Sequence, residues 1–192
     1  MTTASNMEKK GPIEMIKHIA VASLVLAAIT FAPTVGAQSG QATMPDNLKA
    51  PDGSVLHFET FATGTQIYVC TARADDPESF AWSFKAPEAE LLDETGAQVG
   101  SHYAGPSWEG NDGSKVVGEV VERADAADPG SIPWLLLRAK SHDGSGIFST
   151  TTYIQRLQTA GGVAPTDGCD QSTAGVERAV PYTAVYAFYS GS

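Results

Sequence analysis

The sequence predicts an all-β protein, a single-domain antiparallel sandwich or barrel of about nine or ten strands. Apolar and polar residues alternate with a period of two along most of the chain after residue 50, which is typical of half-buried strands. Turn signals recur roughly every 8–12 residues, and 19 Gly and 11 Pro among 192 residues suit many turns. After residue 37, only a single turn near residues 87–91 has any helical character.

The expected strands follow from this alternation, from β-branched and aromatic residues, and from the turns between them. Gly64 ends the first strand, the turn at 94–97 closes a hairpin, and Asn111-Asp112-Gly113 is strong turn chemistry. The acidic segment 122–131 and the Gly- and Pro-rich segment 158–175 are expected loops. The expected strands are 55–61, 65–71, 80–85, 89–93, 98–103, 107–109, 115–121, 132–140, 147–157 and 180–188.

The start of the chain has the order of a secretory signal peptide. A lysine-containing lead-in precedes the charge-free run 19–31, and Val35-Gly36-Ala37 offers the small residues that a signal peptidase requires. The run is shorter than the roughly 20 residues of a membrane-spanning helix. We expect residues 1–37 to be a signal peptide cleaved after Ala37, and a secreted or periplasmic protein. Possible starts are Met1, Met7 and Met15.

Behind this segment we expect a disordered leader over 38–47 and one β-domain over 48–192. The formal net charge of −10 makes phosphate backbones and anionic lipid surfaces unfavourable partners. No second charge-free run follows, so we expect no nucleic-acid partner and no membrane span after cleavage.

The two cysteines, Cys70 and Cys169, are expected to form one disulfide, the default for a lone pair in an oxidising compartment. The alternative is two buried free thiols. Neither cysteine has a neighbouring histidine or a C-x-x-C spacing, which disfavours a catalytic role.

Signatures of enzymes are mostly absent. The sequence has no G-x-S-x-G, S-x-x-K, H-E-x-x-H, phosphate loop or G-x-G-x-x-G. The acidic turns lack the alternating oxygen ligands of a calcium loop, and no two histidines form a close pair. The sequence therefore assigns no cofactor, no metal and no catalytic residue, and it favours a non-enzymatic protein without deciding the question.

The one stretch dense in functional side chains is 100–109. It carries His102, Tyr103, Trp108 and Glu109 around a Gly- and Pro-containing bend. Strand-end loops commonly carry function, the acid–base groups suit proton transfer or ligand hydrogen bonds, and an indole offers a stacking face. We expect these four side chains to border one binding surface, with the 158–168 loop as a further wall. The alternative is that Tyr103 and Trp108 are core and His102 bonds a backbone carbonyl.

Several segments of the chain resemble one known family. They are 100–108 (GSHYAGPSW), 112–116, 132–136, 153–156, 159–165, Cys169 and 180–189 (VPYTAVYAFY). Together they are similar to the secreted bacterial and fungal domain-of-unknown-function family 3455. The resemblance spans about residues 48–189 and implies a secreted single domain, but it assigns no activity.

These observations lead to three hypotheses. The first is a secreted β-domain that binds a small molecule, a glycan or an envelope component without catalysis. The second is a hydrolytic or metal-dependent enzyme centred on His102 and Glu109. The third is a structural or stress-related envelope protein without a ligand.

Overall fold

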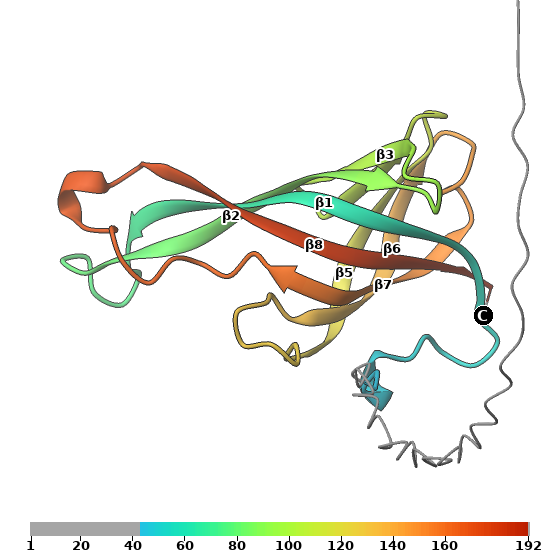
Figure 1. Ribbon diagram of the computed structural model, residues 1–192, viewed down its shortest axis with the longest axis horizontal. Helices are drawn as coiled ribbons and strands as arrows, with labels where there is room; N and C mark the ends of the chain where they lie inside the picture. The colour runs from blue at the N-terminus through green and yellow to red at the C-terminus, as the bar shows by residue number, and fades with distance from the viewer. Residues whose placement is uncertain (1–42, 192) are drawn as a thin grey trace, which may run out of the picture. The chain divides into compact units, whose positions relative to one another are not determined.

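The computed structural model describes residues 43–191, and in them eight strands form one closed antiparallel barrel (Figure 1). Each strand pairs with the next, and β8 pairs back to β1. The all-β prediction is confirmed, and of the two predicted architectures the protein has the barrel. The strands are β1 (Val55–Ala72), β2 (Phe80–Leu92), β3 (Gln98–Tyr103), β4 (Ser107–Gly110), β5 (Lys115–Ala124), β6 (Trp134–Asp143), β7 (Thr151–Gly161) and β8 (Glu177–Ser190).

Helical structure in the described residues is limited to two short 3₁₀ turns, η1 (Asp46–Leu48) and η2 (Gln171–Thr173). No helix in residues 43–191 is long and apolar enough to cross a membrane. The expected signal peptide, 1–37, and residues 38–42 of the expected leader lie outside the described residues.

The strand count is lower than expected because β1 and β2 each join two predicted strands. Gly64, expected to end a strand, lies within β1 opposite Ala89, and the segment 87–91 is part of β2 rather than a helical turn. A Cβ atom at Gly64 would lie 2.2 Å from the carbonyl oxygen of Glu88. Because glycine has no side chain, β2 can pass unusually close to β1 at this position. Strand β1 therefore continues through Gly64 without a break.

The C-terminal end of β1 and the N-terminal ends of β2 and β8 reach beyond the other strands, and we call them the extension (Figure 1). The disulfide Cys70–Cys169, whose Cα atoms are 5.4 Å apart, joins the extension to the 162–176 loop between β7 and β8. The predicted bond is therefore confirmed. Trp82 Nε1 also donates a hydrogen bond to the carbonyl of Asp167 at 2.8 Å, and the Arg178 guanidinium lies over the Trp82 ring. The 162–176 loop is thus fastened to the extension.

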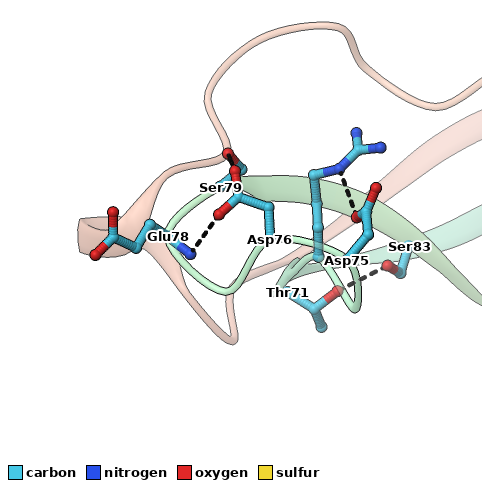
Figure 2. A network of polar contacts seen from close by, with 7 residues as sticks. Thr71, Asp75, Asp76, Glu78, Ser79 and Ser83 are labelled. Carbon is cyan, nitrogen blue, oxygen red and sulfur yellow. Dashed lines mark hydrogen bonds and ion pairs between the residues drawn. The ribbon is translucent and has the colours of Figure 1, made fainter.

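The β1–β2 turn at the tip of the extension is closed by local hydrogen bonds (Figure 2). The Asp76 carboxylate accepts from the Ser79 hydroxyl and from the Glu78 backbone N–H. Arg73 and Asp75 form an ion pair, and the hydroxyls of Thr71 and Ser83 lie 2.7 Å apart across the two strands. Aspartate side chains commonly accept a hydrogen bond from the backbone two residues later in a turn, as Asp76 does from Glu78.

The main core fills one end of the barrel. Aromatic side chains from β1, β4, β8 and the β6–β7 connection meet there, and the ring centroids of Phe148 and Phe188 are 4.8 Å apart. Trp108 and Tyr186, also in contact, continue the cluster toward the other end. The even-numbered residues of β8, from Tyr182 to Phe188, all face this interior, as their shared parity predicts.

A second, smaller cluster lies on the outer face of β6. Leu48 of η1 is fully buried against Trp134 and Leu136, and Met44 packs at its margin. The Gln155 side chain donates a hydrogen bond to the Leu48 carbonyl at 2.6 Å. Residues 43–48 therefore lie against the barrel wall.

Replacing Gly64 by alanine is expected to lower the free energy of unfolding by about 2 kcal/mol or more, because the new methyl group meets backbone atoms that cannot rotate away. Urea unfolding at fixed pH measures this. Gly130→Ala is the matched control, since its Cβ would meet only the Asp128 carboxylate at 3.4 Å. An equal loss in both variants would show that close strand approach at Gly64 is unimportant.

Candidate functional site

The structure divides the four predicted site residues into two pairs on opposite faces of the sheet. In the β3–β4 hairpin, His102 pairs with Trp108, while Tyr103 and Glu109 occupy the alternate positions. His102 and Trp108 face the barrel interior, where their exposed fractions are 2% and 1%. Because successive residues of a strand point to opposite faces, Tyr103 and Glu109 lie on the outer face. The hairpin does not bring all four together.

The outer pair interacts with itself. The Tyr103 hydroxyl donates a short hydrogen bond to the Glu109 carboxylate. This bond, together with burial and the charge of Glu109, raises the pKa of Tyr103 to about 12. The phenol is therefore protonated at neutral pH, and its proton is held by Glu109 rather than presented to a ligand.

The inner pair is a stacked arrangement. The rings of His102 and Trp108 lie 4.5 Å apart and nearly parallel, and the Tyr186 ring lies 5.0 Å from the imidazole. His102 Nδ1 is 2.8 Å from the Ser107 carbonyl oxygen. A carbonyl only accepts, so Nδ1 carries the proton and Nε2 is left as an acceptor. The carbonyl contact and the buried Trp108 match the alternative interpretation, whereas Tyr103 lies outside the core.

Burial dominates the titration of His102. It lowers the pKa to about 3, although the hydrogen bond to Ser107 acts in the opposite direction. The imidazole is therefore neutral at physiological pH, and its stacking on Trp108 is that of an uncharged ring.

A hollow of about 650 Å³ opens at the end of the barrel opposite the phenylalanine-rich core, and we call it the mouth pocket. Its walls come from β1, β2, the 104–106 bend, β5, β7 and the 132–135 segment. The walls are largely apolar and include Tyr68, Phe84, Pro87, Pro106, Val120 and Leu135.

Five polar or charged side chains also line the mouth pocket, namely Gln66, Lys85, His102, Arg123 and Arg156, and of these Lys85 and Arg123 are exposed. The other three, Gln66, His102 and Arg156, are at least partly buried. Gln66 is 2% exposed, and its Nε2 has no hydrogen-bond partner. Arg156 is half-buried, and both Nε and Nη2 donate to the Pro133 carbonyl, at 3.1 and 2.9 Å. We call these three side chains the polar floor.

Two tyrosines extend the polar floor into the barrel. The hydroxyls of Tyr182 and Tyr186 are buried and lack a hydrogen bond of good geometry. Burial raises the pKa of both, and their surroundings include Gln66 and Arg156. Unpartnered buried polar groups are rare in folded proteins, since each costs about 1–3 kcal/mol.

The 158–168 loop, expected as a wall, does not line the mouth pocket. Its Gly162 carbonyl instead accepts a 2.6 Å hydrogen bond from the hydroxyl of Tyr68, a wall residue. The loop therefore holds the side chain of Tyr68 in the wall of the mouth pocket and does not form a wall itself.

Gln66 and Arg156 were not predicted as site residues. Their signal in the sequence is parity: Arg156 shares the face of Ile154, and Gln66 shares the face of Tyr68 and Cys70. A polar residue on the apolar face of a strand is unusual and marks an interior polar position. The strands were predicted separately from local patterns, and such patterns do not show that Gln66 and Arg156 line the same hollow.

His57 and His142, the other two histidines within residues 43–191, lie outside the mouth pocket. His142 Nε2 is 2.7 Å from the Thr151 carbonyl, and His57 Nε2 is 3.4 Å from the Thr151 hydroxyl. In residues 43–191, no group of three or more His, Cys, Asp or Glu side chains is arranged to hold a metal ion.

Comparison with protein families gives a match over residues 51–190 to the family described as protein of unknown function (DUF3455). The chain belongs to this family. The match covers all eight strands of the barrel, and it confirms the resemblance seen in the sequence. No curated protein and no solved structure matches the chain.

The depressed pKa of His102 predicts a loss of stability on mild acidification. The unfolded imidazole takes up a proton below about pH 6.5, whereas the folded one does so only near pH 3. Stability is therefore complete above about pH 6.5 and falls as pH drops toward 3. Between about pH 7 and pH 5 we expect His102 to account for roughly 2 kcal/mol of lost unfolding free energy.

Urea unfolding at both pH values tests this with His102→Asn, whose amide can donate to the Ser107 carbonyl without titrating. This variant should lose less stability on acidification than the unmodified protein. Burial also lowers the pKa of His57, but less than that of His102, so His57→Asn should reduce the pH dependence by a smaller amount than His102→Asn. An unchanged pH dependence in His102→Asn would contradict the depressed pKa.

Proposed function

We propose that this protein binds a small, largely apolar molecule in the mouth pocket and does so outside the cytoplasm. The observation that carries the proposal is the combination of an open hollow of about 650 Å³ with a buried, unpartnered amide nitrogen, Gln66 Nε2, in its lining. Small-molecule sites in proteins are concave, mostly apolar and about 300–1,000 Å³ in volume, with a few polar groups that fix orientation.

The walls and the polar floor supply different parts of such binding. Phe84 and Val120, 56% and 51% exposed, place apolar surface at the rim, where a ligand would cover it. Gln66 Nε2 offers a donor and His102 Nε2 an acceptor within the same hollow. A ligand that accepts a hydrogen bond from Gln66 Nε2 offsets the cost of burying that nitrogen, which favours an occupant with a polar group over a purely apolar one.

The lining of the mouth pocket favours binding over the hydrolytic hypothesis. No Asp or Glu side chain contributes to it, and Glu109 lies on the outer face bonded to Tyr103. His102 has no carboxylate to orient it, and an imidazole with a pKa near 3 is a weak general base at neutral pH. The groups needed for acid–base hydrolysis are thus not gathered in this pocket.

The proposed location rests on two observations. The disulfide Cys70–Cys169 is of the kind that persists in oxidising compartments, and the N-terminal sequence has the order of a signal peptide. An extracellular or periplasmic binding domain accounts for both.

Binding of Nile red, a neutral apolar dye, tests the proposal by fluorescence titration. Val120→Trp places a bulky ring at the rim and is expected to weaken saturable dye binding at least about tenfold by occlusion. Val121→Trp is the matched control, because Val121 is the adjacent residue, is also exposed and does not line the mouth pocket.

Two results would contradict the proposal. One is the absence of saturable dye binding to the folded, unmodified protein. The other is an equal loss of binding in Val120→Trp and Val121→Trp, which would place the dye outside the mouth pocket.

A further inference from the structure

The charged side chains of the mouth pocket are all cationic. Lys85, Arg123 and Arg156 line it, whereas no acidic side chain does. The whole chain carries 22 Asp and Glu against 12 Lys and Arg. A cationic hollow therefore runs against the average charge of the protein, and the mouth pocket differs electrostatically from the rest of the surface.

Two of these three cations have no anionic partner. Lys85 Nζ lies 2.5 Å from a carboxylate oxygen of Glu177, so the positive charge of Lys85 already has an anionic partner. Arg123 and Arg156 form no ion pair with any side chain in residues 43–191. Arg123 is exposed and Arg156 half-buried, which places one positive charge nearer the solvent and the other deeper.

The Arg156 guanidinium is held in place from one side. Its Nε and Nη2 both donate to the Pro133 carbonyl, and Arg156 lies opposite Leu135 and Tyr186 on the neighbouring strands. The guanidinium also interacts with the Tyr186 hydroxyl. Because it has five N–H donors in a planar fork, these contacts still leave donors unused. Holding the fork in advance reduces the ordering cost of binding an anion.

Gln66 supplies a second, independent sign that an acceptor belongs at the polar floor. Its side chain is 2% exposed, lines the mouth pocket and has an Nε2 without a partner. The buried Tyr182 hydroxyl interacts with Gln66 and Tyr186, but no hydrogen bond of good geometry forms there. Gln66 Nε2 therefore still has a proton to donate, and a carboxylate, which only accepts, is complementary to it.

We infer that the ligand is a small organic acid whose carboxylate is bound by Arg156 with help from Gln66 and Arg123, and whose apolar body lies against the walls. This inference rests on the proposed function, because it names the ligand class of the same pocket. The apolar walls distinguish such an acid from inorganic phosphate or sulfate, which offers them no apolar surface.

Three naphthalene derivatives of similar shape and different charge test the inference: naphthoate, naphthamide and naphthylmethylamine. Calorimetric titration of the unmodified protein should show naphthoate bound at least about tenfold more tightly than the amide, with the amine weakest. Inorganic sulfate at the same concentration should not compete with naphthoate. Rising salt should weaken naphthoate binding and leave the amide nearly unchanged.

Variants assign the effect to the two arginines. Arg123→Gln, at an exposed position, and Arg156→Gln should each weaken naphthoate binding severalfold or more and weaken naphthamide binding clearly less, so that the preference for naphthoate shrinks. Lys140→Gln is the matched control, because it removes one positive charge from an exposed residue that does not line the mouth pocket. Arg123→Gln keeps the test decisive if the loss of the Pro133 contact prevents Arg156→Gln from folding.

Equal affinity for naphthoate and naphthamide would overturn the inference, as would equal weakening in Lys140→Gln and Arg123→Gln. The Nile red titration separates this failure from failure of the proposed function. Saturable dye binding that Val120→Trp blocks, without carboxylate preference, would leave the binding function standing and remove only the acid. Failure of every probe to bind would remove both.

Discussion

The pairing of β8 with β1 closes the barrel, and its single enclosed interior follows from this pairing. It runs from Val55 opposite Ser190 to Val69 opposite Glu177, and it joins the last strand to the first. Without it, the sheet would have two open edges and the even-numbered face of β8 would be exposed. With it, eight strands enclose a single interior, and every inward-facing residue must either fill that interior or line a hollow in it.

The two ends of the barrel meet this requirement differently. At one end, Phe58, Phe148 and Phe188 pack into a closed aromatic core. At the other, Gln66 and Arg156 stand on inward-facing positions, where apolar side chains would otherwise close the interior. His102, stacked on Trp108, lies where the two regions meet. Polar residues at such positions weaken a core, which is the usual cost of building a site into a stable fold.

The alternation of apolar and polar residues predicted most of the strands and the inward face of β8, because alternation is a local property of a half-buried strand. The sequence also predicted the disulfide from its compartment. It did not predict that β1 and β2 are continuous, since Gly64 reads as a break unless the close approach of Glu88 is known. It grouped His102 with Glu109, but alternation put them on opposite faces. The polar floor combines β1, β3 and β7, and such long-range convergence has no local signal.

The proposed ligand requires that the closed barrel keep an open hollow and that an anionic acceptor complete the polar floor. A crystal structure of the protein grown with naphthoate tests this requirement most directly. We predict the naphthalene rings between Phe84 and Val120, and carboxylate oxygens within hydrogen-bond distance of Arg156 and Gln66 Nε2. A mouth pocket closed by rearranged side chains, with Gln66, Arg156, Tyr182 and Tyr186 bonded to one another and naphthoate elsewhere, would contradict it.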